Sequence, residues 1–368
     1  MSIDLAAAAG GGRPWDPSLS IDEIERRLAA VWEQTLRKGP VRRDDQFHRF
    51  GADCAVELLW RVEARFGRRL PLSTFFTGGS TVAGMARALI AAENPANSTT
   101  EPALVVLQPQ GSRPPICWLP GGSGLSALSV RSVSLLLGPD QPVYALETPV
   151  RPEGPFDLRR RATAYVEALR ARLAPPYWLF GFSYGAWMAL EMARQIGAIG
   201  AAVKQLVVFD AAVPRDFTAR ERALKAAQHL RWHLQRARTE PLKELARLAN
   251  GLLRRTGLIA AQAQGDPTLP PGSVYNVVDR AVRAGIRDYA QEPQLPWSGR
   301  ITLVLGERRE WPGMAGELDL RMGWRNIAGG GFNVIRVPGD HLSMLEGAEA
   351  DGLAAKLRGL LETGAVAL

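Results

Sequence analysis

Seven short apolar segments, rich in β-branched and aromatic residues, alternate with helical segments along most of the chain. Strands of a parallel sheet covered by helices on both faces are continuously apolar, whereas strands of a half-exposed sheet alternate apolar and polar residues. The pattern therefore predicts an α/β fold around a mostly parallel sheet. The predicted strands are 103–107, 116–119, 143–146, 177–180, 206–209, 301–305 and 332–337, and the clearest helical segments are 158–173, 185–196 and 347–362.

About ninety residues, mostly of helical pattern, separate the fifth and sixth predicted strands. A plain crossover between parallel strands is much shorter. We therefore expect a helical insertion, about residues 212–295, that covers one edge of the sheet.

The chain before the sheet divides by composition. Residues 1–20 are rich in Ala, Gly and Pro and are expected to be disordered, residues 21–92 have a helical pattern, and the polar stretch 93–102 is expected to be a linker. Residues 103–368 then form the α/β domain.

Three amphipathic runs within residues 21–92 predict a small helical bundle. Apolar residues recur at helical spacing in 24–36, 56–66 and 82–89. Asp53 stands where the second helix needs an N-cap residue, and the third helix is expected to begin at Ser80-Thr81.

The net charge of +8 raises the question of nucleic-acid binding, and its distribution answers it. Residues 215–255 contain eleven Lys and Arg against four Asp and Glu, so nearly the whole excess lies inside the expected insertion. Leucines recur at helical spacing among these charges, which indicates the solvated face of amphipathic helices. No zinc-finger spacing or basic-aromatic RNA motif occurs, and we expect no nucleic-acid partner.

Composition also bears on compartment and on metals. The two cysteines, Cys54 and Cys117, are too few for a disulfide framework or a four-thiolate zinc site. The start of the chain lacks a signal-peptide pattern, and no apolar run approaches the roughly 18 residues of a membrane span. We expect a cytoplasmic protein with no metal and no membrane partner.

Residues 181–185 read Gly-Phe-Ser-Tyr-Gly between a predicted strand and a predicted helix. A strand, a tight turn and a helix around G-x-S-x-G form the nucleophile elbow that exposes a serine at the edge of an α/β-hydrolase sheet. Ser183 is therefore the predicted nucleophile.

The serine needs a base, and the chain has four histidines. His48 precedes the linker, while His229 and His233 stand on the basic insertion, with Leu230 in place of the glutamate of an H-E-x-x-H zinc site. His341 follows the last strand in a Pro-Gly loop, which is the place of the catalytic histidine in this fold. His341 is the predicted base.

Two carboxylates at strand ends are candidates for the acid that orients the histidine. Asp210 directly follows the strand 206–209, and Glu307 follows 301–305 after Gly306. Spacing alone leaves both open. Asp340, next to His341, is expected to form hydrogen bonds within its loop.

An oxyanion hole requires two backbone N–H groups directed at the developing charge. We expect one from Tyr184, which follows the nucleophile, and one from Gly121 in the glycine-rich loop 120–124. Cys117, inside a predicted strand, is expected to be a core residue.

The second part resembles the type I thioesterase domain that ends nonribosomal peptide synthetases. The resemblance rests on LQPQGSRPPICWLPGG, GPDQPVYALE, PYWLFGFSYGAWMALEMA, LVVFDAAVP and GWRNI…VPGDHLSMLEG. In that family the acid follows the strand after the nucleophile helix, which implies Asp210, and a mobile helical lid is implied for 212–295.

The first part resembles a peptidyl carrier domain, a small all-α four-helix bundle, in VRRDDQFHRFGADCAVELLWRVEARFGRRLPLSTFF and STVAGMARAL. The family carries 4′-phosphopantetheine on a serine after an aspartate at the head of the second helix. This chain has Asp53-Cys54 there, so the attachment site does not carry over to Cys54.

These resemblances imply release of an acyl or peptidyl chain from a carrier-bound thioester, by hydrolysis or cyclisation, with no cofactor required by the thioesterase. The partner is an upstream synthetase or acyl carrier, because the chain shows no adenylation or condensation domain. The alternative is a free-standing editing hydrolase or esterase with an inert carrier-like docking module.

Overall fold

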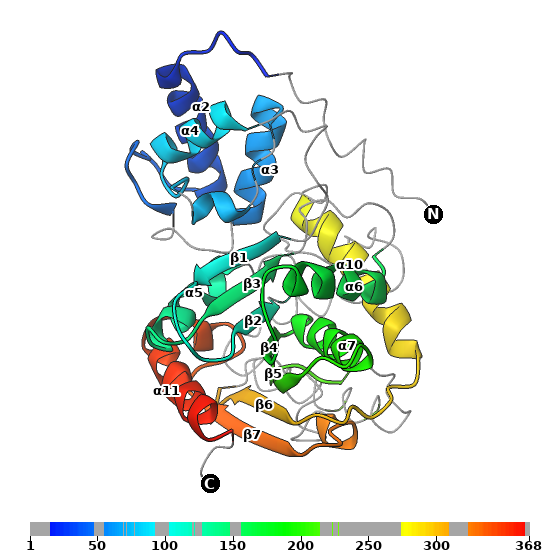
Figure 1. Ribbon diagram of the computed structural model, residues 1–368. Helices are drawn as coiled ribbons and strands as arrows, with labels where there is room; N and C mark the ends of the chain where they lie inside the picture. The colour runs from blue at the N-terminus through cyan, green and yellow to red at the C-terminus, as the bar shows by residue number, and fades with distance from the viewer. Residues whose placement is uncertain are drawn as a thin grey trace.

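The computed structural model shows seven strands in one sheet flanked by helices (Figure 1). The predicted linker 93–102, Asp53, Cys54 and most of the expected insertion before residue 274 lie outside the described residues. The structure describes residues 15–47, 55–68, 70, 72–76, 78–92, 103–119, 121, 127–147, 156–213, 223, 227, 274–308 and 323–364.

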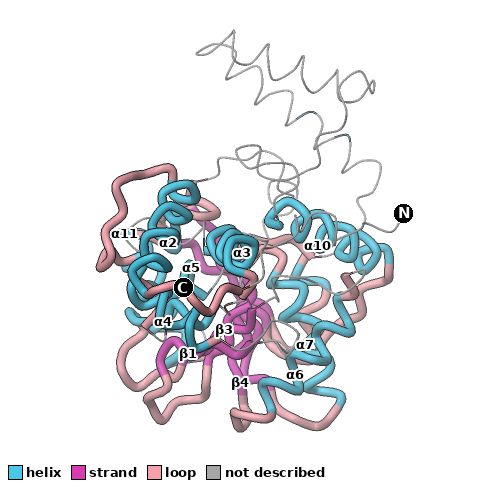
Figure 2. The backbone as a smooth tube through the Cα atoms, turned by 90° about the horizontal axis from the view of Figure 1, so that it is seen from above, coloured by secondary structure: helices cyan, strands magenta, loops and turns pink. Residues whose placement is uncertain are grey.

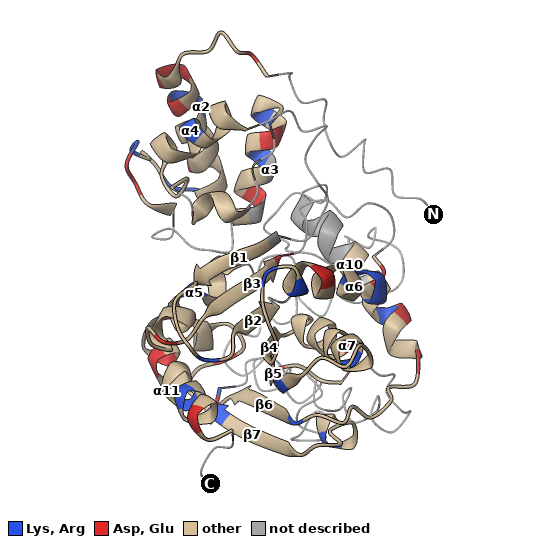
Figure 3. Cartoon of the chain, viewed as in Figure 1, with Lys and Arg blue, Asp and Glu red and all other residues tan. Residues whose placement is uncertain are grey.

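The sheet has the order β1-β3-β2-β4-β5-β6-β7. β1 pairs antiparallel with β3 and every other pair is parallel, which confirms the mostly parallel sheet. β2, β4 and β6 contain no charged residue and are buried along their whole length (Figure 3). The strands are β1 Ala103–Gln108, β2 Ile116–Leu119, β3 Val143–Glu147, β4 Tyr177–Phe182, β5 Val203–Phe209, β6 Ile301–Gly306 and β7 Phe332–Val337.

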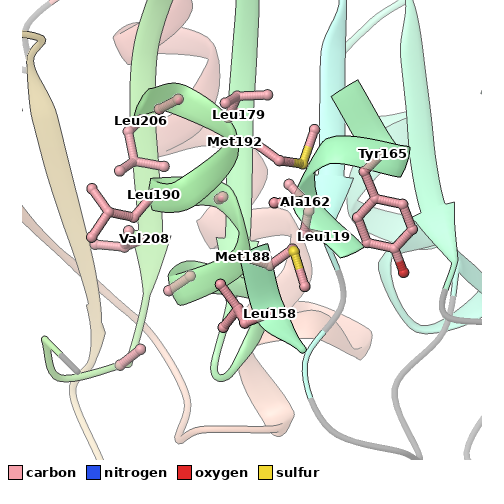
Figure 4. Close-up of a cluster of buried hydrophobic side chains, with 14 of the residues drawn as sticks. Leu119, Leu158, Ala162, Tyr165, Leu179, Met188, Leu190, Met192, Leu206 and Val208 are labelled. Carbon is pink, nitrogen blue, oxygen red and sulfur yellow. The ribbon is translucent and has the colours of Figure 1, made fainter. Parts of the chain in front are cut away.

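Helices cover both faces of the sheet. α6 (Leu158–Arg170) and α7 (Gly185–Ala198) pack on one face, in the core cluster that includes Leu179 and Leu206 (Figure 4). α5 (Ala127–Leu136) and α11 (Gly347–Thr363) pack on the other, around Trp118 and Phe180. Successive strand side chains point to opposite faces, so a strand buried on both sides must be apolar throughout.

The N-terminal part has its own core. α2 (Ile21–Leu36), α3 (Ala55–Phe66) and α4 (Val82–Ala91) enclose buried apolar side chains that include Trp32 and Phe47. The three predicted helices are thus present. This part also contains the short 3-10 helix η3 (Leu72–Phe75), and a fourth α-helix is not found among its described residues.

This bundle lies against the β1 edge of the sheet domain (Figures 1 and 2). Phe76 packs against both the bundle core and the core beneath α5, and Leu128 of α5 packs against the bundle core. α3 also contacts α10 (Val274–Gln291), which is the described helix of the expected insertion.

The C-terminal end of α10 is held on α7 by a buried polar network. The Tyr289 hydroxyl donates to Glu191 Oε2 at 2.8 Å, and Arg194 Nη1 donates to the Tyr289 oxygen at 3.0 Å. Gly285 lies so close to Phe156 that a side chain there would collide with the Phe156 carbonyl. The described end of the expected lid is therefore fixed to the core.

None of the helices that the structure describes is long and apolar enough to cross a membrane.

Candidate active site

Ser183 occupies a strained turn between β4 and α7. Its φ is +52°, in the left-handed region that non-glycine residues seldom adopt. The Ser183 N–H donates to the Phe209 carbonyl at 3.0 Å, and the Ser183 carbonyl accepts from the Ala186 N–H at 3.0 Å. A Cβ on Gly181 would lie 2.6 Å from the Gly185 oxygen, so the close approach of strand and helix requires glycine. The tight strand–turn–helix expected around Ser183 is present.

Asp210 directly follows β5, the strand next to β4. Phe182 and Phe209 are register partners, so Ser183 and Asp210 are the next residues at the carboxyl ends of adjacent strands. The Asp210 N–H donates to the Val304 carbonyl at 2.8 Å, and its side chain is buried, with 8% of the residue exposed.

His341 lies in the loop between β7 and α11 and contacts both strand ends. Its Nδ1 is 2.8 Å from Asp210 Oδ2, and its ring centroid is 4.9 Å from that of Phe182. A proton on Nδ1 donates to the carboxylate and makes Nε2 the basic nitrogen of the ring. The imidazole is thus bonded to one strand end and packed against the residue before Ser183.

The loop that carries His341 is held by its own hydrogen bonds. Asp340 Oδ1 accepts from the backbone N–H groups of Leu342 and Ser343 at 3.0 and 2.9 Å. These bonds, with the Ser343 N–H contributing most, lower the pKa of the Asp340 carboxyl. Asp340 therefore acts as the expected hydrogen-bonding residue of its loop.

Of the two candidate acids, the structure brings Asp210 to within hydrogen-bond distance of His341 Nδ1. Glu307 is exposed, and its backbone N–H continues the β6–β7 pairing by donating to the Val337 carbonyl at 2.9 Å. The geometry therefore favours Asp210 as the partner of His341.

The two residues expected to form an oxyanion hole lie at the same edge of the sheet. Tyr184 is the N-cap residue of α7, and Gly121 follows β2, whose Leu119 is paired with Gly181 of β4. The rest of the glycine-rich loop, Pro120 and residues 122–126, lies outside the described residues. Both backbone N–H groups thus belong to segments that leave adjacent strands beside Ser183.

Other residues considered from the sequence lie elsewhere. Cys117 is fully buried in β2, and burial raises the pKa of its thiol, as expected for a core residue. His48, Cys54, His229 and His233 fall outside the described residues. Within the described part of the chain, no group of three or more metal-ligating side chains occurs.

Glu147 is a half-buried carboxyl at the carboxyl ends of the parallel strands, and the sequence analysis missed it. It ends β3, next to β2, and its Oε1 accepts from the N–H of Ala127, the first residue of α5, at 2.7 Å. Burial raises the pKa of Glu147 to about 7, and the Ala127 hydrogen bond opposes that shift. The sequence feature that could have identified Glu147 is its position directly after the predicted apolar strand 143–146.

The raised pKa predicts a pH dependence of stability. Because the folded chain binds this proton more tightly than the unfolded chain, the stabilisation is present below the ordinary pKa and lost as pH rises through about 7. Glu147→Gln keeps an acceptor for the Ala127 N–H but does not titrate. We expect the Tm of the wild type to fall relative to Glu147→Gln between about pH 5 and pH 8.

Glu349→Gln is the matched control for this comparison, followed by circular dichroism. Arg308 lowers the pKa of Glu349, so its titration lies below the tested range. A constant Tm difference between wild type and Glu147→Gln across the range would contradict this placement of Glu147.

Comparison with known proteins agrees with this geometry. The thioesterase domain family profile matches residues 114–361. Chondramide synthase cmdD of Chondromyces crocatus is 26% identical over 358 residues, which cover 91% of this chain and 9% of that protein. Indigoidine synthase of Streptomyces lavendulae is 31% identical over 199 residues, covering 52% of this chain and 15% of that protein.

Among solved structures, holo-AB3403, a four-domain nonribosomal peptide synthetase bound to AMP and glycine, is similar in fold. The TM-score is 0.52 at 21% sequence identity, and the match covers 94% of this chain and 26% of that chain. The chain thus spans a small part of the synthetases that it matches. Since the family profile covers most of the chain, including the segments of Ser183, Asp210 and His341, the chain belongs to the thioesterase domain family of α/β-hydrolase enzymes.

Proposed function

We propose that this chain releases an acyl or peptidyl group from a carrier-bound thioester through an acyl-enzyme on Ser183, in nonribosomal peptide or polyketide biosynthesis. The observation that carries the proposal is the pairing of His341 Nδ1 with Asp210 Oδ2 beside the Ser183 turn, in a thioesterase-family chain. Similar proteins that are named as synthetases support the setting.

In the proposed acylation, Ser183 Oγ attacks the thioester carbonyl while His341 Nε2 takes the hydroxyl proton. Asp210 orients the ring and stabilises its charged form. The N–H groups of Gly121 and Tyr184 stabilise the tetrahedral oxyanion. When the C–S bond breaks, His341 returns the proton to the departing sulfur, which leaves as a thiol.

Deacylation repeats these roles with a different nucleophile. His341 removes a proton from water, or from an amine or hydroxyl of the acyl chain itself, and that atom attacks the Ser183 ester. Water gives a free acid, and an internal nucleophile gives a ring. These residues complete both steps without a metal or nucleotide.

Mass spectrometry of the products from a panel of acyl and peptidyl thioesters tests this proposal. We expect cleavage of at least one class, with the product mass equal to the free acid or to the acid less one water. If thioesters of every class remain intact while the chain is folded, chain release is the wrong function.

The second candidate is an editing hydrolase or esterase whose carrier-like module only docks. Two observations favour it: Cys54 stands where the carrier family has its serine, and Phe76 and Leu128 pack the bundle against the sheet domain. Turnover of acyl-coenzyme A and turnover of the same acyl group on a partner carrier distinguish the two functions. The editing hydrolase prefers the small thioester, and the chain-release enzyme prefers the carrier.

The Cys54 position predicts how the bundle responds to a phosphopantetheinyl transferase. The transferase reaction needs a hydroxyl to attack the pyrophosphate of coenzyme A, and phosphoryl transfer to sulfur gives a weaker bond. A thiol at this position therefore does not fit the phosphopantetheine arm. We expect no gain of mass for the wild type with coenzyme A and a broad-specificity transferase, and full modification of Cys54→Ser.

Intact-mass analysis measures the mass gain of the wild type and of Cys54→Ser. Cys117→Ser introduces a serine at a buried position and is the control that should remain unmodified. Modification of the wild type at Cys54 would contradict this expectation. It would make the two parts a carrier and thioesterase that act in cis.

A further inference from the structure

Two tryptophan side chains donate hydrogen bonds to the backbone directly after Asp210. Trp324 Nε1 donates to the Ala211 carbonyl at 2.6 Å, and Trp187 Nε1 donates to the Ala212 carbonyl at 2.7 Å. The donors are 113 and 25 residues away from their acceptors in sequence. Two unrelated segments thus converge on adjacent peptide groups.

The turn that they hold is strained and buried. Asp210 has a φ of +45°, a conformation that costs a non-glycine residue free energy and persists only when its surroundings impose it. Ala211 is almost fully buried and Ala212 is half-buried, so water is not a ready partner for the Ala211 carbonyl. The Asp210 N–H, the Ala211 carbonyl and the Ala212 carbonyl are instead bonded to Val304, Trp324 and Trp187.

The two donors connect this turn to separate parts of the domain. Trp187 lies in the first turn of α7, one helical turn after Ser183, and therefore ties the residues after the acid to the helix of the nucleophile. Trp324 begins the 3-10 helix η6 (Trp324–Asn326) and is completely buried. η6 is followed by Ile327, whose carbonyl accepts from the Trp297 N–H at 2.8 Å.

Ala212 is also where the expected lid insertion begins. The two indole hydrogen bonds lie between Asp210 and the rest of that segment.

We propose that Trp324 and Trp187 are positioning residues that hold the turn after Asp210, so that its carboxylate keeps its contact with His341 Nδ1. The inference rests on the proposed function, because it takes Asp210 as the acid. Neither tryptophan touches the reacting atoms. Each acts through the backbone that presents Asp210.

The test compares Trp→Phe variants, which remove an indole N–H and keep an aromatic ring. Trp324→Phe and Trp187→Phe are each expected to lower kcat by about tenfold, the effect of losing one buried hydrogen bond in the transition state, with KM within about twofold. The substrate is a thioester that the wild type cleaves.

Trp118→Phe is the matched control. Trp118 is also completely buried and packs 4.8 Å from the Phe209 ring, but its Nε1 has no hydrogen-bond partner among the described residues. We expect its kcat to remain within about threefold of wild type, although the smaller ring lowers stability. An equal loss in this control would assign the effect to packing and overturn the inference.

A second measurement, by NMR, detects the contact between His341 and Asp210 directly and does not require turnover. The proton shared by His341 Nδ1 and Asp210 should give a strongly downfield NMR resonance, assigned by its loss in Asp210→Asn. We expect it to shift or weaken in Trp324→Phe and Trp187→Phe and to stay in Trp118→Phe. If the large cavity prevents Trp324→Phe from folding, the half-buried Trp187 still provides the test.

The inference would be overturned if folded Trp324→Phe and Trp187→Phe both kept the downfield resonance unchanged and kept kcat within threefold of wild type. Failure of the proposed function has a different signature, since the folded wild type would then leave every thioester intact while the NMR comparison still reports on the turn after Asp210.

Discussion

Ser183→Ala is expected to abolish thioester cleavage, with kcat lowered by about 10⁴–10⁶-fold. In the proposed mechanism the Ser183 hydroxyl forms the acyl-enzyme, and Ser183 is the residue of positive φ on the turn before α7. The fold should be unaffected, because alanine at this position still donates its N–H to the Phe209 carbonyl and accepts from the Ala186 N–H. Steady-state kinetics on a cleaved thioester and a thermal melt measure both parts of this prediction.

Ser134→Ala is the matched serine control. The Ser134 hydroxyl donates to the Val130 carbonyl at 2.7 Å within α5, and its loss should leave kcat within about twofold. Turnover of Ser183→Ala within tenfold of wild type would remove Ser183 from the mechanism.

Asp210→Asn should lower kcat by about 10²–10⁴-fold, whereas Glu307→Gln should change it by less than about threefold. The amide at position 210 keeps the volume of the side chain but no longer stabilises a charged imidazole, and it can favour the wrong tautomer of His341. Glu307 is exposed and bonded through its backbone. Parallel kinetics of the two variants give the ranking.

The reversed ranking would place the acid after β6. It would mean that the 2.8 Å contact between His341 Nδ1 and Asp210 Oδ2 is not the one used in turnover.

Local pattern was sufficient to predict the sheet and its main helices. Each of the seven predicted strands is present, because a strand buried on both faces, such as β2 or β6, must be apolar throughout. The end of β4 was less predictable. The strand continues through Gly181 to Phe182, since the turn at Ser183 needs a glycine one step inside the strand.

Spacing alone left Asp210 and Glu307 open and the family resemblance implied Asp210, but the physical reason for the choice lies in the tertiary structure. β6 lies between β5 and β7, so Glu307 stands on the strand next to the histidine loop. That loop nevertheless passes close over the end of β6, where a Cβ on Gly306 would lie 2.8 Å from the Gly339 oxygen. His341 thereby reaches Asp210, while the backbone of Glu307 pairs with Val337.

Contacts between distant segments were beyond the reach of sequence patterns. Neither the bond from Trp324 to the Ala211 carbonyl nor that from the Ala127 N–H to Glu147 follows from spacing, because each joins the ends of elements that meet only in the folded sheet. A tryptophan or glutamate at such a position has the same local pattern as any other core or loop residue.

The most direct measurement is the mass of the enzyme quenched during single turnover with an acyl thioester, followed by peptide mapping. The account predicts one acyl increment on the peptide that contains Ser183, formed no more slowly than product appears and absent from Ser183→Ala. Product release with no transient adduct on that peptide, or an adduct on another residue, would contradict it.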